Sequence, residues 1–177
     1  MAIRPNSVRV VRVTAVLRRR LASKWRHHIE RSGERVEFDW FDERVLLWVA
    51  LLRNEIVGHV SCKIEEVDWA DCGELQRFEE KPDAVQSRDL NVTEAFVQSF
   101  AVDPAYRRLG VGRRLQTAMV RACKKQGVSQ LRSWSSCDAV ENYRLKLSMG
   151  FCVVPSYYFV PRANKWSRGA YFVMKLR

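Results

Sequence analysis

The sequence predicts a mixed α/β fold of one domain spanning residues 1–177, with about seven strands and roughly four helices. Two observations lead to this fold class. Apolar runs of strand length alternate along the chain with segments whose apolar residues recur at helical spacing. Near the middle, a short apolar strand passes through a glycine turn into an amphipathic helix. At 177 residues, 47% of them apolar, the chain is long enough to bury a core.

The overall composition argues against several classes of protein. No apolar run approaches the roughly 20 residues that cross a membrane. The five cysteines are scattered and form no C-x-x-C pair, so we expect no disulfide framework and no metal site, and a cytoplasmic location. The net charge of +11 raises nucleic-acid binding as an alternative. A polyanionic ligand and a solvated surface account for much of this charge, so nucleic acid is not the favoured partner.

The first elements are a strand and a helix. Residues 8–13 alternate as a strand, and Thr14 can cap a helix that stops near Ser32 and Gly33. The first 29 residues contain no acidic residue and many arginines, which is also typical of an organelle transit peptide. Targeting is therefore the alternative to a folded strand and helix.

A hairpin and two irregular segments follow. Residues 34–42 contain clustered aromatic residues that either plug the core or form a wall for an acceptor substrate. Residues 45–52 and 56–64 predict a hairpin, in which Gly58 indicates a bulge or a close backbone approach. His59 could act as a base, but a partly exposed and inert strand histidine is the favoured interpretation. The acidic residues 65–91 predict a lid or an acceptor-facing insertion that favours a cationic acceptor.

The central strand, turn and helix predict an anion site. Residues 96–102 alternate as a strand, which Asp103 and Pro104 end. Gly110 and Gly112 follow, and apolar residues at helical spacing run from Val111 until Gly127. The free amides and the positive dipole end of a helix N-terminus bind anions. The turn is ringed by four arginines, namely Arg107, Arg108, Arg113 and Arg114.

Phosphate is the favoured anion at this turn, and a surface turn with solvated arginines is the alternative. The spacing is not that of a P-loop, which needs Gly-x4-Gly-Lys-Ser/Thr. It is not the dinucleotide fingerprint either, because Leu115 stands where a third glycine is needed.

The last elements are a strand over residues 130–135, a helix over residues 138–149 with Asp138 as candidate N-cap, and two strands over residues 151–160 and 170–176. The last two strands are expected to form an antiparallel pair. Pro155 indicates an edge or a kink in the first of them.

Residues 107–112, behind a strand that ends in Asp103 and Pro104, resemble the acetyl-CoA signature of the GNAT N-acetyltransferase superfamily. Arg107, Gly110 and Gly112 match its (Gln/Arg)-x-x-Gly-x-(Gly/Ala) pattern, and a helix closing on Gly-Phe matches at 150–151. The resemblance implies a sheet that is splayed at the acyl-CoA site. Because the fold of that family begins with a strand and a helix, it also favours a folded N-terminus over targeting.

The resemblance further implies acetyl-CoA as co-substrate and assigns the residues that bind it. Backbone groups of 100–102 would pair with the pantetheine arm, and amides around 108–113 would hold the pyrophosphate. Asn142 could reach the pantetheine. The expected cofactor-binding residues are thus Phe100, Ala101, Val102, Arg107, Arg108, Leu109, Gly110, Val111, Gly112, Arg113 and Asn142.

The candidate catalytic residues are Glu94, Tyr143 and Lys146. Family members often carry a glutamate base on the central strand, but Phe96 stands at that position and Glu94 lies one pleat earlier. An apolar setting would raise the pKa of the Glu94 carboxyl group toward neutrality. A solvated Glu94, or a water relay without a dedicated base, is the alternative.

The family's usual acid tyrosine is replaced by Lys146. Tyr143 and Asn142 lie one turn earlier on the same helix face, so Tyr143 could act as the acid. Lys146 could instead stabilise thiolate charge. The further alternative is that the chain has lost this step, since a CoA thiolate is a tolerable leaving group unaided.

The predicted function is acetyl-CoA-dependent N-acetylation of a primary amine by direct attack. The acceptor is a small molecule or a peptide or protein amine, and the chain is a monomer or homodimer that binds no membrane. The alternatives are a CoA-binding regulatory module without turnover and a basic nucleic-acid-binding protein.

Overall fold

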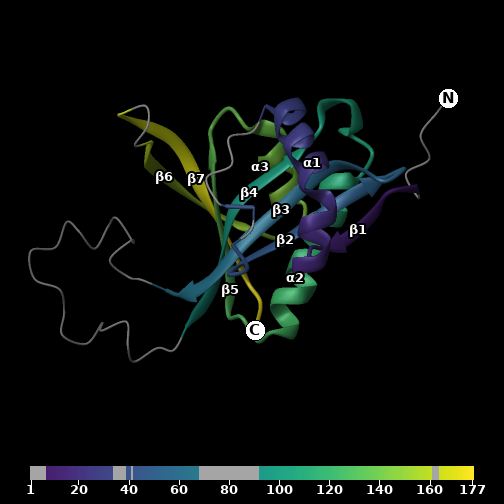
Figure 1. Cartoon of the computed structure of the whole chain (residues 1–177). Coiled ribbons are helices and arrows are strands. Elements are labelled where there is room, and N and C mark those ends of the chain that lie inside the picture. The colour runs from purple at the N-terminus through teal and green to yellow at the C-terminus, as the bar shows by residue number, and fades with distance from the viewer. Residues whose placement is uncertain (1–6, 34–38, 41, 68–91, 161–163) are drawn as a thin grey trace, which may run out of the picture.

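A computed structural model describes residues 7–33, 39–40, 42–67, 92–160 and 164–177 (Figure 1). Its seven strands form one sheet in the order β1-β2-β3-β4-β5-β7-β6. The strands are β1 (Arg9–Arg12), β2 (Val45–Leu52), β3 (Glu55–Glu66), β4 (Thr93–Val102), β5 (Gln130–Ser136), β6 (Cys152–Val160) and β7 (Lys165–Lys175). The helices are α1 (Ala15–Ser32), α2 (Val111–Lys125) and α3 (Val140–Leu147), and Pro104–Tyr106 form a 3-10 turn.

The mixed α/β class and the seven strands are confirmed. The described part of the chain has three α-helices rather than roughly four, and a single 3-10 turn follows Asp103. No helix of the described residues is both long enough and apolar enough to cross a membrane.

Helices cover both faces of the sheet, so its central strands are buried on both sides. Along β2, Trp48 and Ala50 pack in the cluster that contains α2, whereas Leu47 and Val49 pack in the cluster that contains α1. This division follows from the strand geometry, in which successive side chains point to opposite faces. It explains why β2 reads as a continuous apolar run (VLLWVALL) rather than an alternating one.

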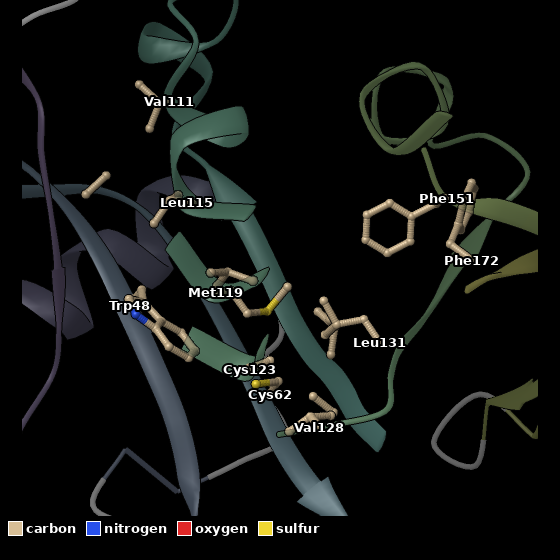
Figure 2. Packing of buried hydrophobic residues seen from close by; sticks show 14 of the residues in the cluster. Trp48, Cys62, Val111, Leu115, Met119, Cys123, Val128, Leu131, Phe151 and Phe172 are labelled. Atoms are coloured by element: carbon tan, nitrogen blue, oxygen red, sulfur yellow. The ribbon is translucent and has the colours of Figure 1, made fainter. Parts of the chain in front are cut away.

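The cluster beneath α2 is the larger of the two (Figure 2). Leu115, Met119 and Cys123 lie along one face of α2, at spacings of four residues, and all three are fully buried. Cys123 contacts Cys62 of β3, and both are free thiols. The hydrogen bond with Cys123, together with burial, raises the pKa of the Cys62 thiol, so the thiol stays protonated as a core residue.

The predicted ends of α1 are confirmed. The Thr14 side chain accepts a hydrogen bond from the Leu17 amide at 3.4 Å, and Gly33 ends the helix with φ of 68°. The helix packs against β3 through its apolar face, which carries Leu21, Trp25 and the buried His28.

The predicted hairpin of β2 and β3 is confirmed, and so is the close approach at Gly58. A Cβ atom at this position would lie 3.0 Å from the Ala101 carbonyl oxygen of β4 and 3.2 Å from Leu115 of α2. The hairpin register also shifts beside this glycine, between Ala50 and Leu51. The absence of a side chain therefore lets α2 and β4 close on β3.

The helix expected over residues 138–149 is shorter, and Asp138 is not its cap. Helix α3 begins after Ala139, which makes no side-chain cap. The Asp138 carboxylate instead accepts a hydrogen bond from the Cys137 thiol at 3.1 Å. The expected antiparallel pair is confirmed as β6 and β7, although β7 starts earlier than predicted.

Strands β4 and β5 form the parallel pair of the sheet, and they pair only over Glu94–Val97 and Gln130–Ser133. Both strands continue beyond these residues, each still paired with its other neighbour. They therefore diverge after Val97 and Ser133, somewhat earlier than the expected Ala101 region. This confirms the predicted splay and opens a gap in the middle of the sheet.

Two predicted features lie wholly or partly outside the described residues. Of the predicted acidic lid at 65–91, residues 68–91 are outside the described structure, and so are two of the clustered aromatics, Phe38 and Phe41. The third aromatic, Trp40, is buried against Trp25 with ring centroids 4.5 Å apart, so it belongs to the core.

Candidate functional site

A pocket of about 1140 Å³ occupies the gap between the diverging strands. Its walls come from the end of β4, the turn before α2 with the first turn of that helix, the end of β5, and α3. Of the eleven residues predicted to bind the cofactor, ten line it, namely Phe100, Ala101, Val102, Arg107, Arg108, Gly110, Val111, Gly112, Arg113 and Asn142. Leu109 does not line it and packs against the hydrophobic core instead.

The end of β4 offers free backbone groups to the pocket. Between Ser99 and Val102 the strand pairs only with β3, because β5 has already diverged. In an antiparallel ladder a strand's amides and carbonyls point alternately to its two sides. Every second residue of this segment therefore directs its backbone toward the pocket, where an extended ligand can pair with it as an added strand. The Val102 carbonyl oxygen already accepts a hydrogen bond from Arg107 Nε at 3.2 Å.

The N-terminus of α2 opens into the same pocket. Gly110 is the N-cap, with φ of 77° and no side-chain capping bond. The first amides of the helix therefore have no capping side chain. At Gly112 a Cβ atom would lie 3.1 Å from Phe100 and 3.3 Å from Leu145, so a side chain here would crowd the two walls of the pocket. The two glycines leave backbone, rather than side chains, at this end of the pocket.

The arginines of the turn divide between the pocket and the core. Arg107, Arg108 and Arg113 line the pocket, together with Arg144 of α3. Arg108 lies 2.7 Å from Glu141, and Arg113 donates to the Ser148 hydroxyl at 2.6 Å. The fourth predicted residue, Arg114, points away and donates to the Val8 carbonyl at 3.1 Å. The predicted ring of four arginines is thus wrong at Arg114.

The candidate residues of α3 share one helix face, as predicted, and contact β5. Asn142 Nδ2 donates to Ser135 Oγ at 2.6 Å, and the Tyr143 hydroxyl lies 3.4 Å from the Ser135 carbonyl oxygen. Tyr143 does not line the pocket, and burial raises the pKa of its phenol. The Asn142 Oδ1 atom is buried without a protein hydrogen-bond donor.

Lys146 is almost completely buried beneath the pocket, at 1% exposure. Its ammonium group donates to the hydroxyl of Ser133, a pocket residue, and lies 4.8 Å from the centre of the Phe172 ring. Burial lowers the pKa of Lys146 to about 7, so both protonation states are populated near neutral pH. Lys146 reaches the pocket only through Ser133, and its role in stabilising a thiolate stays a prediction.

The expectation that Glu94 lies in an apolar setting at the cleft is wrong. Glu94 is 1% exposed and is not a pocket residue. Arg132 donates to its carboxylate at 2.6 and 2.9 Å, and Gln130 donates at 3.0 Å. These bonds hold the carboxylate as part of the β4–β5 pair, which argues for a structural role.

We expect Glu94→Gln to lower the free energy of unfolding by about 3 kcal/mol, because it removes the buried negative charge of the Glu94–Arg132 ion pair and weakens the charge-assisted hydrogen bonds that Arg132 donates. The midpoint of urea unfolding measures this. The control is Glu141→Gln, which breaks exposed ion pairs with Arg108 and Arg144 and should cost less than about 1 kcal/mol. A stable Glu94→Gln protein whose pH–rate profile loses its acidic limb would instead restore Glu94 as the base.

The structure also corrects the prediction for His59, which is neither exposed nor isolated. His59 is fully buried and lies 2.8 Å from His28 of α1 and 2.7 Å from Ser99 of β4. A signal for His28 exists in the sequence, because it lies on the same helix face as Leu21 and Trp25. The partnership of the two histidines depends on how α1 packs on the sheet and leaves no such signal. Among the described residues, no three metal-ligating side chains come together.

Comparisons with known proteins match these features. The family model described as "Acetyltransferase (GNAT) family" matches residues 14–151. The solved structure of Arabidopsis thaliana NAA60 in complex with a bisubstrate analogue is 18% identical with a TM-score of 0.67, and the match covers 95% of this chain and 97% of that one. No curated protein sequence matches the chain.

Two bacterial structures are similar as well. The ribosomal-protein-S18-alanine N-acetyltransferase of Escherichia coli is 17% identical with a TM-score of 0.58, and the match covers 94% of this chain and 91% of that one. The putative acetyltransferase yncA of Salmonella typhimurium, solved with acetyl-CoA, is 16% identical with a TM-score of 0.64, covering 97% and 95%. At sequence identities of 16–18%, the similarity to these three structures shows the fold of the chain.

Proposed function

Because the chain belongs to the GNAT acetyltransferase family, we propose that it transfers the acetyl group of acetyl-CoA to a primary amine by direct attack. The observation that carries the proposal is the pocket itself. A strand edge with free backbone groups and an uncapped helix N-terminus flanked by arginines both open into one gap in the sheet. A long, mostly extended ligand with a phosphate-bearing end fits this combination.

The residues present fit acetyl-CoA. The free edge of β4 at 100–102 would pair with the amides of the pantetheine arm. The amides of the first turn of α2, with Arg107 and Arg113, would hold the pyrophosphate. The buried Asn142 Oδ1 has no protein donor, and a pantetheine amide would supply one.

Acetyl-CoA supplies the acetyl group and a thiolate leaving group. The free amides near Phe100 would polarise the carbonyl on which the amine attacks, because a hydrogen bond to the oxygen stabilises the negative charge that develops there. The Ser133 hydroxyl faces the pocket with Lys146 behind it. That pair can pass a proton toward the departing sulfur. The arrangement needs no covalent acyl-enzyme, since amine and thioester can meet in one pocket.

Two kinds of neighbour bear on the acceptor. The name of the Escherichia coli protein states an alanine of a ribosomal protein as its substrate, and the Arabidopsis thaliana structure holds a bisubstrate analogue. We propose that the acceptor of this chain is an amine of either a small molecule or a peptide. The pocket extends to Ser32 at the end of α1, so the acceptor would enter on the α1 side of the sheet.

We expect the chain to release free CoA thiol from acetyl-CoA only when an amine is added, and the amine to gain the mass of one acetyl group. A panel of small amines, polyamines and short peptides, read by a thiol reagent and by mass spectrometry, measures both. Acetyl-CoA binding without thiol release from any amine would contradict turnover and favour a regulatory module. RNA retention that is salt-sensitive and survives saturating CoA would favour a nucleic-acid-binding protein.

A further inference from the structure

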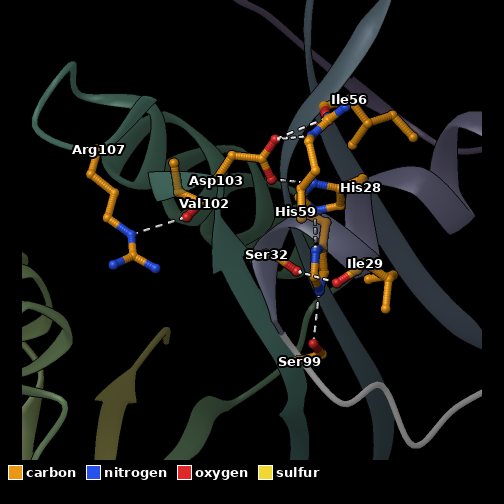
Figure 3. A network of polar contacts seen from close by, with 10 residues as sticks. His28, Ile29, Ser32, Ile56, His59, Ser99, Val102, Asp103 and Arg107 are labelled. Atoms are coloured by element: carbon orange, nitrogen blue, oxygen red, sulfur yellow. Dashed lines mark hydrogen bonds and ion pairs between the residues drawn. The ribbon is translucent and has the colours of Figure 1, made fainter. Parts of the chain in front are cut away.

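Four polar side chains run in line from the pocket wall into the protein (Figure 3). Ser99 Oγ lies 2.7 Å from His59 Nε2, and His59 Nδ1 lies 2.8 Å from His28 Nε2. His28 Nδ1 lies 2.6 Å from Asp103 Oδ1. Ser99 is also a pocket residue. These four residues, which we call the Ser99–Asp103 chain, connect the pocket with the carboxylate that follows β4.

The Ser99–Asp103 chain is enclosed except at its two ends. Both histidines are 0% exposed, and the Trp25 ring packs against them. At the far end, Arg31 donates to Asp103 Oδ2 at 3.0 Å, and the Arg31 side chain is 33% exposed. One end thus meets the pocket and the other meets a side chain that reaches solvent.

Asp103 determines which atom carries each proton in the Ser99–Asp103 chain. His28 Nδ1 and Asp103 Oδ1 lie 2.6 Å apart, and neither atom makes a regular hydrogen bond to any described group. Because a carboxylate has no proton to donate, the proton at this contact is on His28 Nδ1. A neutral imidazole has one donor and one acceptor, so His28 Nε2 accepts from His59 Nδ1, and His59 Nε2 accepts from the Ser99 hydroxyl. Burial lowers the pKa of both histidines, which keeps them neutral as this pattern requires.

Stability alone does not account for the arrangement. Two imidazoles, a hydroxyl and a carboxylate are costly to bury, and well-packed apolar side chains would fill the same space at lower cost. The Ser99 hydroxyl contacts a base, His59, and Ser99 is also one of the residues that line the pocket. This is the geometry by which a histidine activates a hydroxyl as a proton acceptor.

We infer that the Ser99–Asp103 chain is a proton relay that takes the proton of the attacking amine, and this inference rests on the proposed acetyl transfer. Ser99 is the catalytic residue, because it alone of the four residues lines the pocket and its hydroxyl has a basic neighbour. His59, His28 and Asp103 act through it as positioning residues. The charged groups that face the two rings in the described structure are Asp103, after β4, and Arg31, on α1.

The relay balances the reaction. The nitrogen–carbon bond forms and the carbon–sulfur bond breaks, so the nitrogen must lose one proton and the thiolate must gain one. Ser99 Oγ takes the proton from nitrogen as its own proton passes to His59 Nε2. The proton of His59 Nδ1 can pass to His28 Nε2, and that of His28 Nδ1 to the Asp103 carboxylate. Arg31 only donates, so Asp103 holds the proton until it returns along the same path to water in the pocket after the product leaves. The thiolate takes its proton from the Ser133 hydroxyl, to which Lys146 donates, or from water.

A first test of the relay does not depend on catalytic activity. Nitrogen NMR of the histidine side chains at neutral pH should show His28 and His59 neutral, each with its proton on Nδ1. Ser99→Ala should shift the signal of His59 Nε2, because that atom loses its donor. A proton on His59 Nε2 would mean that His59 donates to Ser99 instead of accepting from it. That result would overturn the relay whatever the activity of the protein.

The second test compares two amines with the Ser99→Ala protein. For the most active alkylamine of the panel, kcat/KM should fall about 100-fold. For its β-fluorinated analogue, whose weakly basic nitrogen gives up its proton to water more readily after attack, the fall should be less than about 10-fold. A structural defect would lower both rates equally. Ser99→Thr, which keeps the hydroxyl, should recover most of the rate.

The matched control is Ser61→Ala. Ser61 is a fully buried serine on β3 beside Ser99, but it does not line the pocket. Ser61→Ala should leave kcat/KM for both amines within about twofold of the values for the unmodified protein. If Ser99→Ala leaves kcat/KM unchanged for both amines, or lowers it equally for both, the relay is overturned while the proposed acetyl transfer still stands. An unmodified chain that releases no thiol with any amine would overturn the proposed function, and the relay with it.

Discussion

Gly110→Glu should weaken the binding of acetyl-CoA about 100-fold, equivalent to about 2.7 kcal/mol. The substitution places a carboxylate at the N-cap of α2, where the proposed site holds the pyrophosphate. Two like charges would then compete for the same helix amides. The fold should survive, since a Cβ atom at this position meets nothing within 4 Å and a negative charge is favourable at a helix N-terminus. Isothermal titration calorimetry with acetyl-CoA measures the change.

Gly110→Ala is the matched control, because it carries the same strain without the charge. Gly110 has φ of 77°, a conformation that costs other residues about 1–2 kcal/mol. Both variants should therefore lose similar stability, while Gly110→Ala keeps its affinity within about 10-fold. Equal affinities for the two variants would show that no anion is bound at this helix end.

Lys146→Met should stabilise the protein at neutral and acidic pH by about 2–4 kcal/mol. The unfolded lysine has the ordinary pKa of 10.5, whereas burial lowers the folded pKa to about 7, so the ammonium form is held at a cost of up to about 5 kcal/mol. Loss of the bond to Ser133 offsets part of the gain. Methionine matches the length of the buried stem and carries no charge.

The pH dependence separates this cost from ordinary packing effects. Between pH 7 and 10.5 the unfolded state binds the Lys146 proton and the folded state does not, so the stability of the unmodified protein rises with pH in this window. The advantage of Lys146→Met should shrink by about 2 kcal/mol from pH 7 to pH 9, as measured by urea unfolding at each pH. Lys125→Met, at an exposed residue at the end of α2, controls for the lost charge. An advantage that does not change with pH would show that Lys146 is not a titrating buried group.

Much of the fold follows from local patterns. The glycine turn before α2, the Thr14 cap and the β2–β3 hairpin are predictable because each depends on neighbours in the sequence. Gly58 was also informative, since a glycine inside an apolar strand indicates close backbone approach. Residues 68–91 of the acidic segment and most of residues 34–42 lie outside the described structure, and their roles stay predictions.

The site was less predictable where it depends on contacts between distant segments. The backbone part of the pocket follows from its motif, but the neighbours of Glu94, His59 and Lys146 do not. Arg132 meets Glu94 only because β4 and β5 are paired in one particular register. Ser99 lay within a predicted strand without any sign that a histidine from β3 and another from α1 would line up behind it. Such alignments are properties of the packed sheet and helix.

A structure of the chain solved with acetyl-CoA tests the central claim most directly. The thioester arm should lie along the free edge of β4 at 100–102, with the pyrophosphate on the first amides of α2, inside the gap that β4 and β5 leave between them. Acetyl-CoA bound elsewhere on the surface, with that gap closed by side chains, would contradict the account.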